Sequence, residues 1–386
     1  MATSSDVDDR AARPTISRIA ERVTIVQPAL PSYRVDLFDR MAAILGDRFR
    51  VYASPADMGA LTRHERMPSW FSHLGPMRPL LRGRAHWQTG ALGVKVRRGD
   101  IVVVCGAPRC LTNLLLLAKA RLVGARTVWW GHYWSSTSRS WRLALRLPMM
   151  RLGNAQIFYT DAEVREYSAE LGYNPGSRVS ALNNGLNTDP IEACRAPYLA
   201  ADRPRALFFV GRIEPKARLD LLLRSLARPE LEGVELRVVG DGSMVGSLRG
   251  LSRELDLDRR VHWHGGTTDE ATIAAAANAC RLFVYPGEVG LSLVHGMAYG
   301  LPAVVHSDRW THMPEIAAFS NETTGRSFPP NEEAGLAAAI ASLIDLPGTL
   351  DRMSAASLST VRDGFNTAQM TERFLAAIRG LEELAS

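Results

Sequence analysis

Short apolar runs alternate with amphipathic stretches along the whole chain. The runs predict strands at residues 23–26, 49–53, 101–105, 127–130, 156–159 and 179–181, and then at 206–210, 235–239, 261–264, 282–285 and 303–305. Helical periodicity falls between them, notably at 33–45, 111–122, 162–171, 219–226, 244–255 and 268–279. Nearly continuous apolar strands joined by helices indicate parallel sheets that are covered on both faces.

The chain of 386 residues is too long for one ordinary core. Residues 193–205 are rich in Ala, Pro and Arg and predict a linker between two domains. We expect a disordered tail at 1–21, domains at 22–195 and 206–365, and an amphipathic helix at 366–386 that packs back on the first domain. The predicted fold class is α/β, with two Rossmann-like doubly wound domains that face each other across a cleft.

Composition narrows the classes of partner. With 46% hydrophobic and 22% charged residues the chain is globular, and its net charge of +6 is carried almost entirely by Arg. A positive net charge is typical of proteins that bind nucleic acid, an anionic membrane or a phosphorylated ligand. Because the sequence contains no nucleic-acid-binding motif, we expect no nucleic-acid partner. The four cysteines have no zinc spacing, and no run of apolar residues is long enough for a membrane span. These features predict a cytoplasmic protein with reduced thiols.

The stretch 285–305 carries the strongest chemical signal. It predicts a buried strand, a glycine turn, a short helix that starts at Gly290, a second glycine turn and another apolar strand. A helix start after such a turn exposes free backbone N–H groups and the positive end of the helix dipole. This arrangement predicts an anion site that suits a diphosphate.

A second basic signal opens the second half of the chain. The strand at 206–210 ends in Gly211-Arg212, and Lys216 follows before the next helix. Cations after a strand can neutralise a diphosphate as it leaves. A solvated basic loop is the alternative, and the two readings have about equal weight from the residues alone.

The order of these motifs resembles that of retaining glycosyltransferases of the GT-B fold, glycosyltransferase family 4. The similar segments in the second half are 210–212, 238–242, 261–265, 285–305, 314–316 and 324–328. In the first half they are 27–28, 31–38, 130–134 and 183–187, so that the resemblance covers nearly everything after residue 22. It implies an acceptor-binding first domain, a second domain that binds a nucleotide diphosphate-sugar, and sugar transfer with retention of configuration.

The resemblance also implies site residues. The catalytic set is His132, Arg212, Lys216 and Glu288. Donor binding is assigned to Gly211, Gly287, Val289, Gly290, Leu291, Ser292, His295, Asp241, His264 and Asn184. Acceptor binding is assigned to Tyr33, Arg34 and Trp134. No metal and no other cofactor is expected, because family members need none.

Two departures from the family pattern affect the donor site. Counted from Gly290, the positions of the family's paired glutamates hold Gly287 and His295, with Glu288 one residue further on. We expect Glu288 to take the first role and His295 to hydrogen-bond the ribose. The family lysine aligns with Ala217, and we prefer Lys216 to Arg218 as its substitute.

The predicted activity is therefore sugar transfer from a nucleotide diphosphate-sugar, UDP- or GDP-linked, to a hydroxyl of a lipid-linked or surface-polysaccharide glycan. Two alternatives stay open at this point: a GT-B nucleotide-sugar epimerase, and a non-catalytic paralogue that binds nucleotide sugar or membrane. The segment 138–152 is basic and amphipathic, which gives peripheral contact with the anionic inner face of the cell membrane about even weight against an ordinary solvated helix.

Overall fold

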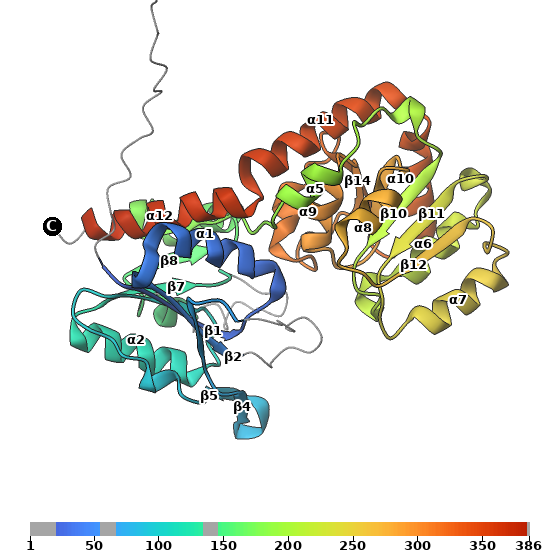
Figure 1. Cartoon of the computed structure of the whole chain (residues 1–386). Coiled ribbons are helices and arrows are strands. Elements are labelled where there is room, and N and C mark those ends of the chain that lie inside the picture. The colour runs from blue at the N-terminus through green and yellow to red at the C-terminus, as the bar shows by residue number, and fades with distance from the viewer. Residues whose placement is uncertain (1–20, 55–66, 134–145, 384–386) are drawn as a thin grey trace, which may run out of the picture.

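Two parallel β-sheets organise the chain into two lobes (Figure 1). The computed structural model describes residues 21–54, 67–133 and 146–383. Within these residues the first lobe has a seven-stranded sheet of order β3-β2-β1-β6-β7-β8-β9, and the second lobe a six-stranded sheet of order β12-β11-β10-β13-β14-β15. Every neighbouring pair in both sheets is parallel, and the predicted α/β fold class is confirmed.

The strands follow the apolar runs closely. The first sheet contains β1 (Val23–Ala29), β2 (Phe49–Ser54), β3 (Phe71–His73), β6 (Ile101–Cys105), β7 (Arg126–Trp130), β8 (Ala155–Phe158) and β9 (Val179–Ala181). The second contains β10 (Ala206–Val210), β11 (Glu235–Val239), β12 (Val261–Gly265), β13 (Leu282–Tyr285), β14 (Ala303–His306) and β15 (Gly325–Phe328). An antiparallel hairpin, β4 (Met77–Leu80) with β5 (Ala85–Gln88), stands apart from both sheets.

Helices cover both faces of each sheet. They are α1 (Val35–Leu45), α2 (Leu111–Val123), α4 (Asp161–Leu171), α5 (Asp189–Cys194), α6 (Leu219–Leu226), α7 (Val245–Glu254), α8 (Glu270–Ala277), α9 (Leu291–Ala298), α10 (Glu333–Ile344), α11 (Pro347–Gly364) and α12 (Thr367–Glu383). The predicted helix at 33–45 instead opens with a 3-10 turn, Ser32–Arg34, before α1. The predicted linker starts inside a helix, because α5 continues to Cys194 and Pro190 at its start favours the helical conformation.

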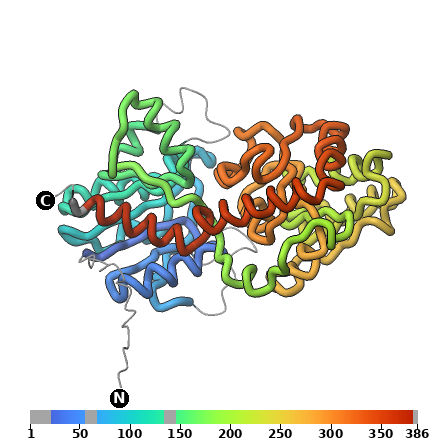
Figure 2. Tube along the Cα trace, turned by 90° about the horizontal axis from the view of Figure 1, so that it is seen from above, coloured from blue at the N-terminus to red at the C-terminus, as the bar shows by residue number. Residues whose placement is uncertain are grey.

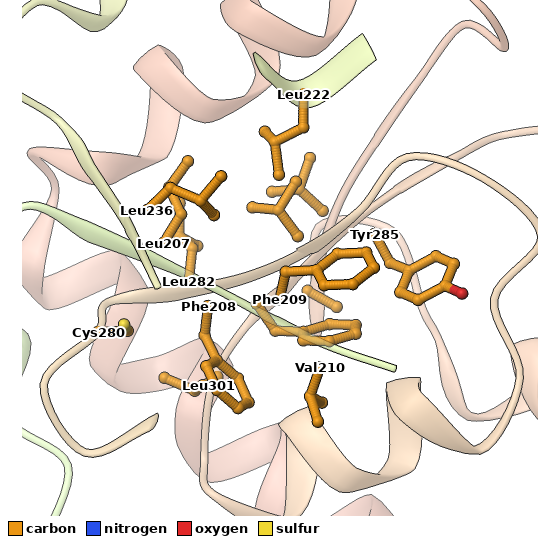
Figure 3. Close-up of a cluster of buried hydrophobic side chains, with 14 of the residues drawn as sticks. Leu207, Phe208, Phe209, Val210, Leu222, Leu236, Cys280, Leu282, Tyr285 and Leu301 are labelled. Atoms are coloured by element: carbon orange, nitrogen blue, oxygen red, sulfur yellow. The ribbon is translucent and has the colours of Figure 1, made fainter. Parts of the chain in front are cut away.

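The position of β10 in the core of the second lobe explains why the sequence predicts this strand correctly. All of its residues are buried, as expected of a strand at the centre of a sheet covered on both faces. Figure 3 shows its Leu207, Phe208 and Phe209 among side chains from neighbouring elements, including Leu222 of α6 and Tyr285 of β13. Phe209 and Tyr285 stack with ring centroids 4.9 Å apart, which fixes the ends of two adjacent strands against each other.

The last two helices join the lobes. α11 lies along the second lobe and α12 along the first, as Figures 1 and 2 both show. Buried side chains of α12, including Phe374 and Ile378, belong to the core cluster of the first lobe. The chain crosses between the helices beside residues 183–187, where the Thr367 N–H donates to the Leu186 carbonyl at 3.1 Å. A Cβ on Gly185 would lie 2.2 Å from the Phe365 carbonyl carbon, so glycine is required for this close crossing.

No single helix within the described residues has the length and apolar character needed to cross a bilayer. α10 and α11 pass that test only as a pair bent by 100° at their junction.

Candidate functional site

The start of α9 offers three unpaired backbone donors at the carboxyl edge of the second sheet. Gly290 is the N-cap residue, and no side chain caps the helix. Among the described residues, the first amide of this turn with a partner is that of Leu293, which donates to the Gly290 carbonyl. The N–H groups of Gly290, Leu291 and Ser292 therefore remain available, and all three residues are partly accessible. This geometry suits an anion.

The loop after β10 places two cations beside this helix start. A Cβ on Gly211 would lie 2.9 Å from the Ser292 Oγ, so the Gly211-Arg212 turn packs directly against the first turn of α9. Arg212 and Lys216 are exposed, and neither forms an ion pair within the described residues. Arg218 differs, because its guanidinium contacts Asp220 and Asn331. Of the two basic residues considered from the sequence, Lys216 is therefore the one without such contacts.

Gly287 and Glu288 are fixed to the same loop. The Glu288 N–H donates to the Lys216 carbonyl at 2.9 Å. A Cβ on Gly287 would lie 2.0 Å from that carbonyl oxygen, so only glycine allows the two loops to meet. The half-buried Glu288 carboxylate consequently lies beside the basic loop.

His312 holds the turn before α9 through two hydrogen bonds of its ring. Its Nδ1 accepts the Val289 N–H at 3.1 Å, and its Nε2 donates to the His306 carbonyl at 2.9 Å. Burial lowers the pKa of His312 to about 4, so the ring is neutral as this pattern requires. Val289 differs from its predicted role as a donor ligand. Its side chain is fully buried, its N–H is taken by His312 and its carbonyl by Met313, so it holds the turn instead.

His295, in the middle of α9, pairs with a carboxylate that the sequence did not single out. Its Nε2 lies 2.9 Å from the Oε1 of Glu270, the first residue of α8, and the Tyr299 hydroxyl donates to the same oxygen. Burial opposes ionisation of Glu270, but these hydrogen bonds and the His295 charge outweigh it, and the pKa lies below its usual value. A carboxylate from another helix is thus present beside His295.

In the first lobe, His132 lies just beyond β7. Its ring centroid is 4.3 Å from that of Tyr159, and its Nδ1 is 3.7 Å from the Glu163 Oε1. Glu163 is buried and accepts backbone N–H groups from Tyr133, Tyr159 and Thr160. It therefore ties the loops after β7 and β8 together, and it lies close to His132, whose side chain is 39% exposed.

Asn184 and Arg34 meet a carboxyl group of the opposite lobe. The Asn184 amide donates to the Glu315 Oε1, and its own oxygen lies 3.5 Å from the Arg34 Nη2. Glu315 is buried, its Oε2 has no partner, and a Cβ on Gly290 would lie 3.5 Å from that oxygen. Burial raises the pKa of Glu315. The predicted donor residue Asn184 is thus a link between the lobes, beside the start of α9.

A second contact between the lobes borders a cavity. Arg309 of the second lobe forms an ion pair with Glu166 of α4. The adjacent cavity has a volume of about 320 Å³ and is lined by both lobes. The first lobe contributes Thr160, Ala162 and Glu163, and the residues from the second lobe include His306, Ser307 and Pro314. The cleft between the lobes is therefore hollowed at the carboxyl ends of the strands, where ligands of such sheets bind.

The remaining predicted residues lie in less defined positions. Tyr33 is 39% exposed beside Arg34. Asp241 follows β11 and accepts the Gly242 N–H, while His264 is exposed at the end of β12. Burial, then the charges of Arg237 and His262, lower the pKa of His264. Trp134, and most of the basic segment 138–152, lie outside the described residues. The described residues contain no cluster of three or more metal-ligating side chains.

Part of the chain matches known protein sequences. Residues 191–359 match the family described as glycosyl transferases group 1. The D-inositol 3-phosphate glycosyltransferase of Mycobacterium tuberculosis is 33% identical over 160 residues, covering 38% of this chain and 33% of the relative. The chain thus spans about a third of the length of the curated relatives it matches.

Solved structures extend the likeness to both lobes. HepE from Anabaena, in complex with UDP, has a TM-score of 0.65 at 16% identity and covers 94% of this chain and 99% of its own. Sucrose-phosphate synthase from Thermosynechococcus elongatus has the same score and identity, with 95% and 100% covered. At these identities the likeness establishes the fold, which is GT-B as predicted.

Proposed function

We propose that the protein is a retaining glycosyltransferase that takes a sugar from a nucleotide diphosphate-sugar. The observation that carries the proposal is the start of α9, where three free N–H groups lie against the loop after β10 that carries Arg212 and Lys216. Fixed donors and cations that meet a leaving diphosphate lower the barrier to its departure. The match of residues 191–359 to a glycosyl transferase family and the UDP in the HepE structure support the same chemistry.

In this mechanism Arg212, Lys216 and the α9 amides hold the diphosphate, and no metal is needed. Glu288 contacts the donor sugar, while His295 and Glu270 bind the ribose hydroxyls. The acceptor hydroxyl attacks from the face that the diphosphate leaves, and its proton passes to a phosphate oxygen of the donor. His132 orients that hydroxyl at the mouth of the first lobe.

The proposed acceptor is a glycan on a lipid or a surface polysaccharide, and the proposed donor is UDP- or GDP-linked. The enzyme would work in the cytoplasm, with peripheral contact to the inner face of the membrane. The net charge of +6 supports such contact, because anionic lipids attract basic surfaces.

Nucleotide binding tests the proposal directly. Isothermal titration with UDP, GDP, dTDP and ADP should identify one preferred nucleotide, and Arg212→Ala should weaken its binding at least tenfold. Arg253→Ala, an exposed arginine on α7 of the same lobe, is the matched control and should bind as the wild type does. Equal affinity in the wild type and Arg212→Ala would reject the proposed diphosphate site.

Turnover separates the remaining alternatives. Radiolabelled nucleotide sugar incubated with a bacterial lipid extract should give labelled lipid whose anomeric configuration matches that of the donor. An isomerised free donor would instead identify an epimerase, and binding without either product would indicate a non-catalytic protein.

A further inference from the structure

A second pocket, the amino-edge pocket, lies at the edge of the first sheet where its strands begin. Its volume is about 290 Å³, near the lower end of the range of roughly 300 to 1,000 Å³ for small-molecule sites. Gly153 and Leu381 of α12 form part of its wall. The rest of the wall is polar and consists of Asn154, Arg121, Arg126, Arg151 and Arg178. A pocket lined mainly by arginines favours an anion of small-molecule size.

The strand order brings these arginines together. β7, β8 and β9 are neighbours in the sheet and run parallel, so their amino ends share one edge. Arg126 is the first residue of β7, Arg151 lies in the turn before β8, and Arg178 immediately precedes β9. Arg121 comes from the last turn of α2, just before β7. Residues far apart in the chain therefore converge on one pocket.

Most of this positive charge has no acidic partner. Of the four arginines, Arg126 alone forms an ion pair within the described residues, with its Nη1 3.2 Å from the Glu21 Oε1. Arg178 is exposed and has neither a hydrogen bond nor an ion pair there. Burial raises the pKa of Tyr167 despite a hydrogen bond with Arg151, so this partner is neutral. Mutual repulsion of the remaining charges favours a bound anion.

The wall of the pocket is held in place by hydrogen bonds. The Arg121 Nη1 donates to the carbonyls of Arg151 and Leu152 at 3.3 and 3.1 Å, which ties the end of α2 to the turn before β8. In the same turn the Asn154 Oδ1 accepts the N–H and the hydroxyl of Thr127 at 2.9 and 2.8 Å. The Asn154 Nδ2 has no partner within the described residues and remains a donor. A site fixed in this way loses little entropy when a ligand binds.

We infer that the amino-edge pocket binds a small molecule with a diphosphate or two separate phosphate groups. Guanidinium forks bind phosphate oxygens through paired, charge-assisted hydrogen bonds, and several forks match more than one phosphate. This site is separate from the cleft, because Trp130 ends β7 at the cleft, roughly 13 Å along the strand from Arg126. The inference therefore does not rest on the proposed function.

Inorganic pyrophosphate is the first probe. Binding is measured by calorimetry in the Arg212→Ala background, so that pyrophosphate held at the start of α9 contributes little. Arg151→Gln and Arg178→Gln, each added to this parent, should weaken binding at least tenfold. Arg165→Gln removes the same charge from an exposed position on α4 of the same lobe and should leave binding unchanged. No binding to the parent, or equal affinity in all four proteins, overturns the inference.

Two comparisons separate a ligand site from general attraction of anions and from a structural role. Sulfate at the same ionic strength should bind at least tenfold more weakly than pyrophosphate, because it presents one anionic group, and equal affinity would refute the match to two phosphates. Without ligand, Arg178→Gln should unfold at the same temperature as its parent, because Arg178 has no contact to lose. Pyrophosphate should raise the unfolding temperature of the parent more than that of the variant. Equal destabilisation of the variant with and without pyrophosphate would assign Arg178 to packing and overturn the inference.

The source of the phosphates is tested with a soluble ligand and a membrane. Fructose 1,6-bisphosphate should bind the parent, and Arg178→Gln should weaken this binding at least tenfold. Phosphatidylcholine vesicles with and without phosphatidic acid provide the lipid arm. Vesicle binding that requires Arg178, without binding of either soluble probe, would assign the arginines to a membrane surface and overturn the inference.

Turnover separates this inference from the proposed function. In an otherwise wild-type chain without added anions, Arg178→Gln should transfer sugar from nucleotide sugar at the wild-type rate, because Arg178 lies away from the cleft. A loss of transfer in this variant would contradict the separation of the two sites. Absence of turnover from the wild type rejects the proposed function alone, whereas pyrophosphate binding that does not need Arg178 rejects this inference alone.

Discussion

The neutral state of His312 gives the sharpest physical prediction. The ring accepts the Val289 N–H at Nδ1 and donates to the His306 carbonyl at Nε2, so a second proton at Nδ1 would face a donor and break the contact. His312 is 2% exposed and stacks on His306 with ring centroids 3.8 Å apart. Protonation therefore favours the unfolded chain.

The magnitude follows from the difference in pKa between the two states. The pKa of His312 is about 4 in the folded protein and 6.5 for an unperturbed histidine. One pKa unit corresponds to about 1.4 kcal/mol. The contribution of neutral His312 to the free energy of unfolding is fully present above pH 6.5. About 3 kcal/mol of it is lost as the pH falls from 6.5 to 4, because the histidine of the unfolded chain binds a proton at a higher pH than that of the folded protein.

The assay compares the wild type with His312→Gln, whose amide can accept from Val289 and donate to His306 without titrating. The two proteins should have similar stability at pH 7, and at pH 4 the variant should be more stable by about 3 kcal/mol in denaturant unfolding of the second lobe. An NMR titration of labelled histidine gives an independent readout. A His312 resonance that titrates near 6.5, or parallel loss of stability in both proteins, would refute the reasoning.

Three further outcomes are expected. Gly287→Ala should weaken UDP binding at least tenfold, because its Cβ would lie 2.0 Å from the Lys216 carbonyl oxygen. A Cβ on Gly290 would meet the flexible Met313 side chain at 3.1 Å and the Glu315 Oε2 at 3.5 Å, an ordinary contact distance, so Gly290→Ala should bind UDP within about threefold of the wild type. Calorimetry of the two variants decides between these outcomes. Glu270→Gln should reduce UDP affinity about tenfold while leaving pyrophosphate affinity unchanged, since the proposed diphosphate site is at the start of α9. Equal losses for both ligands would contradict this. Gly185→Ala should lower the unfolding temperature by several degrees and speed proteolysis between the lobes, because the crossing at the α11–α12 junction has no room for a methyl group, and unchanged values would contradict it.

Much of the fold could be predicted because its signals are local. Fully buried strands such as β10 read as continuous apolar runs, and the glycine turn before α9 is contiguous in the chain. The weak elements were missed for the opposite reason. β3 has only three residues, none of them fully buried. In the hairpin, β4 is largely exposed and β5 has only four residues, of which the buried Gln88 is polar, so neither strand forms a strong apolar pattern.

The α/β class, the glycine-flanked helix start at Gly290 and the basic turn at Arg212 follow from the amino-acid sequence alone, since each depends on neighbours within a few residues. Which groups meet across the sheets and lobes depends on the folded structure. Glu270 reaches His295 from another helix, and Glu315 reaches Asn184 from the other lobe. These contacts depend on the order of the strands in each sheet and on the path of the last two helices. The periodicity of apolar residues along the chain does not predict them.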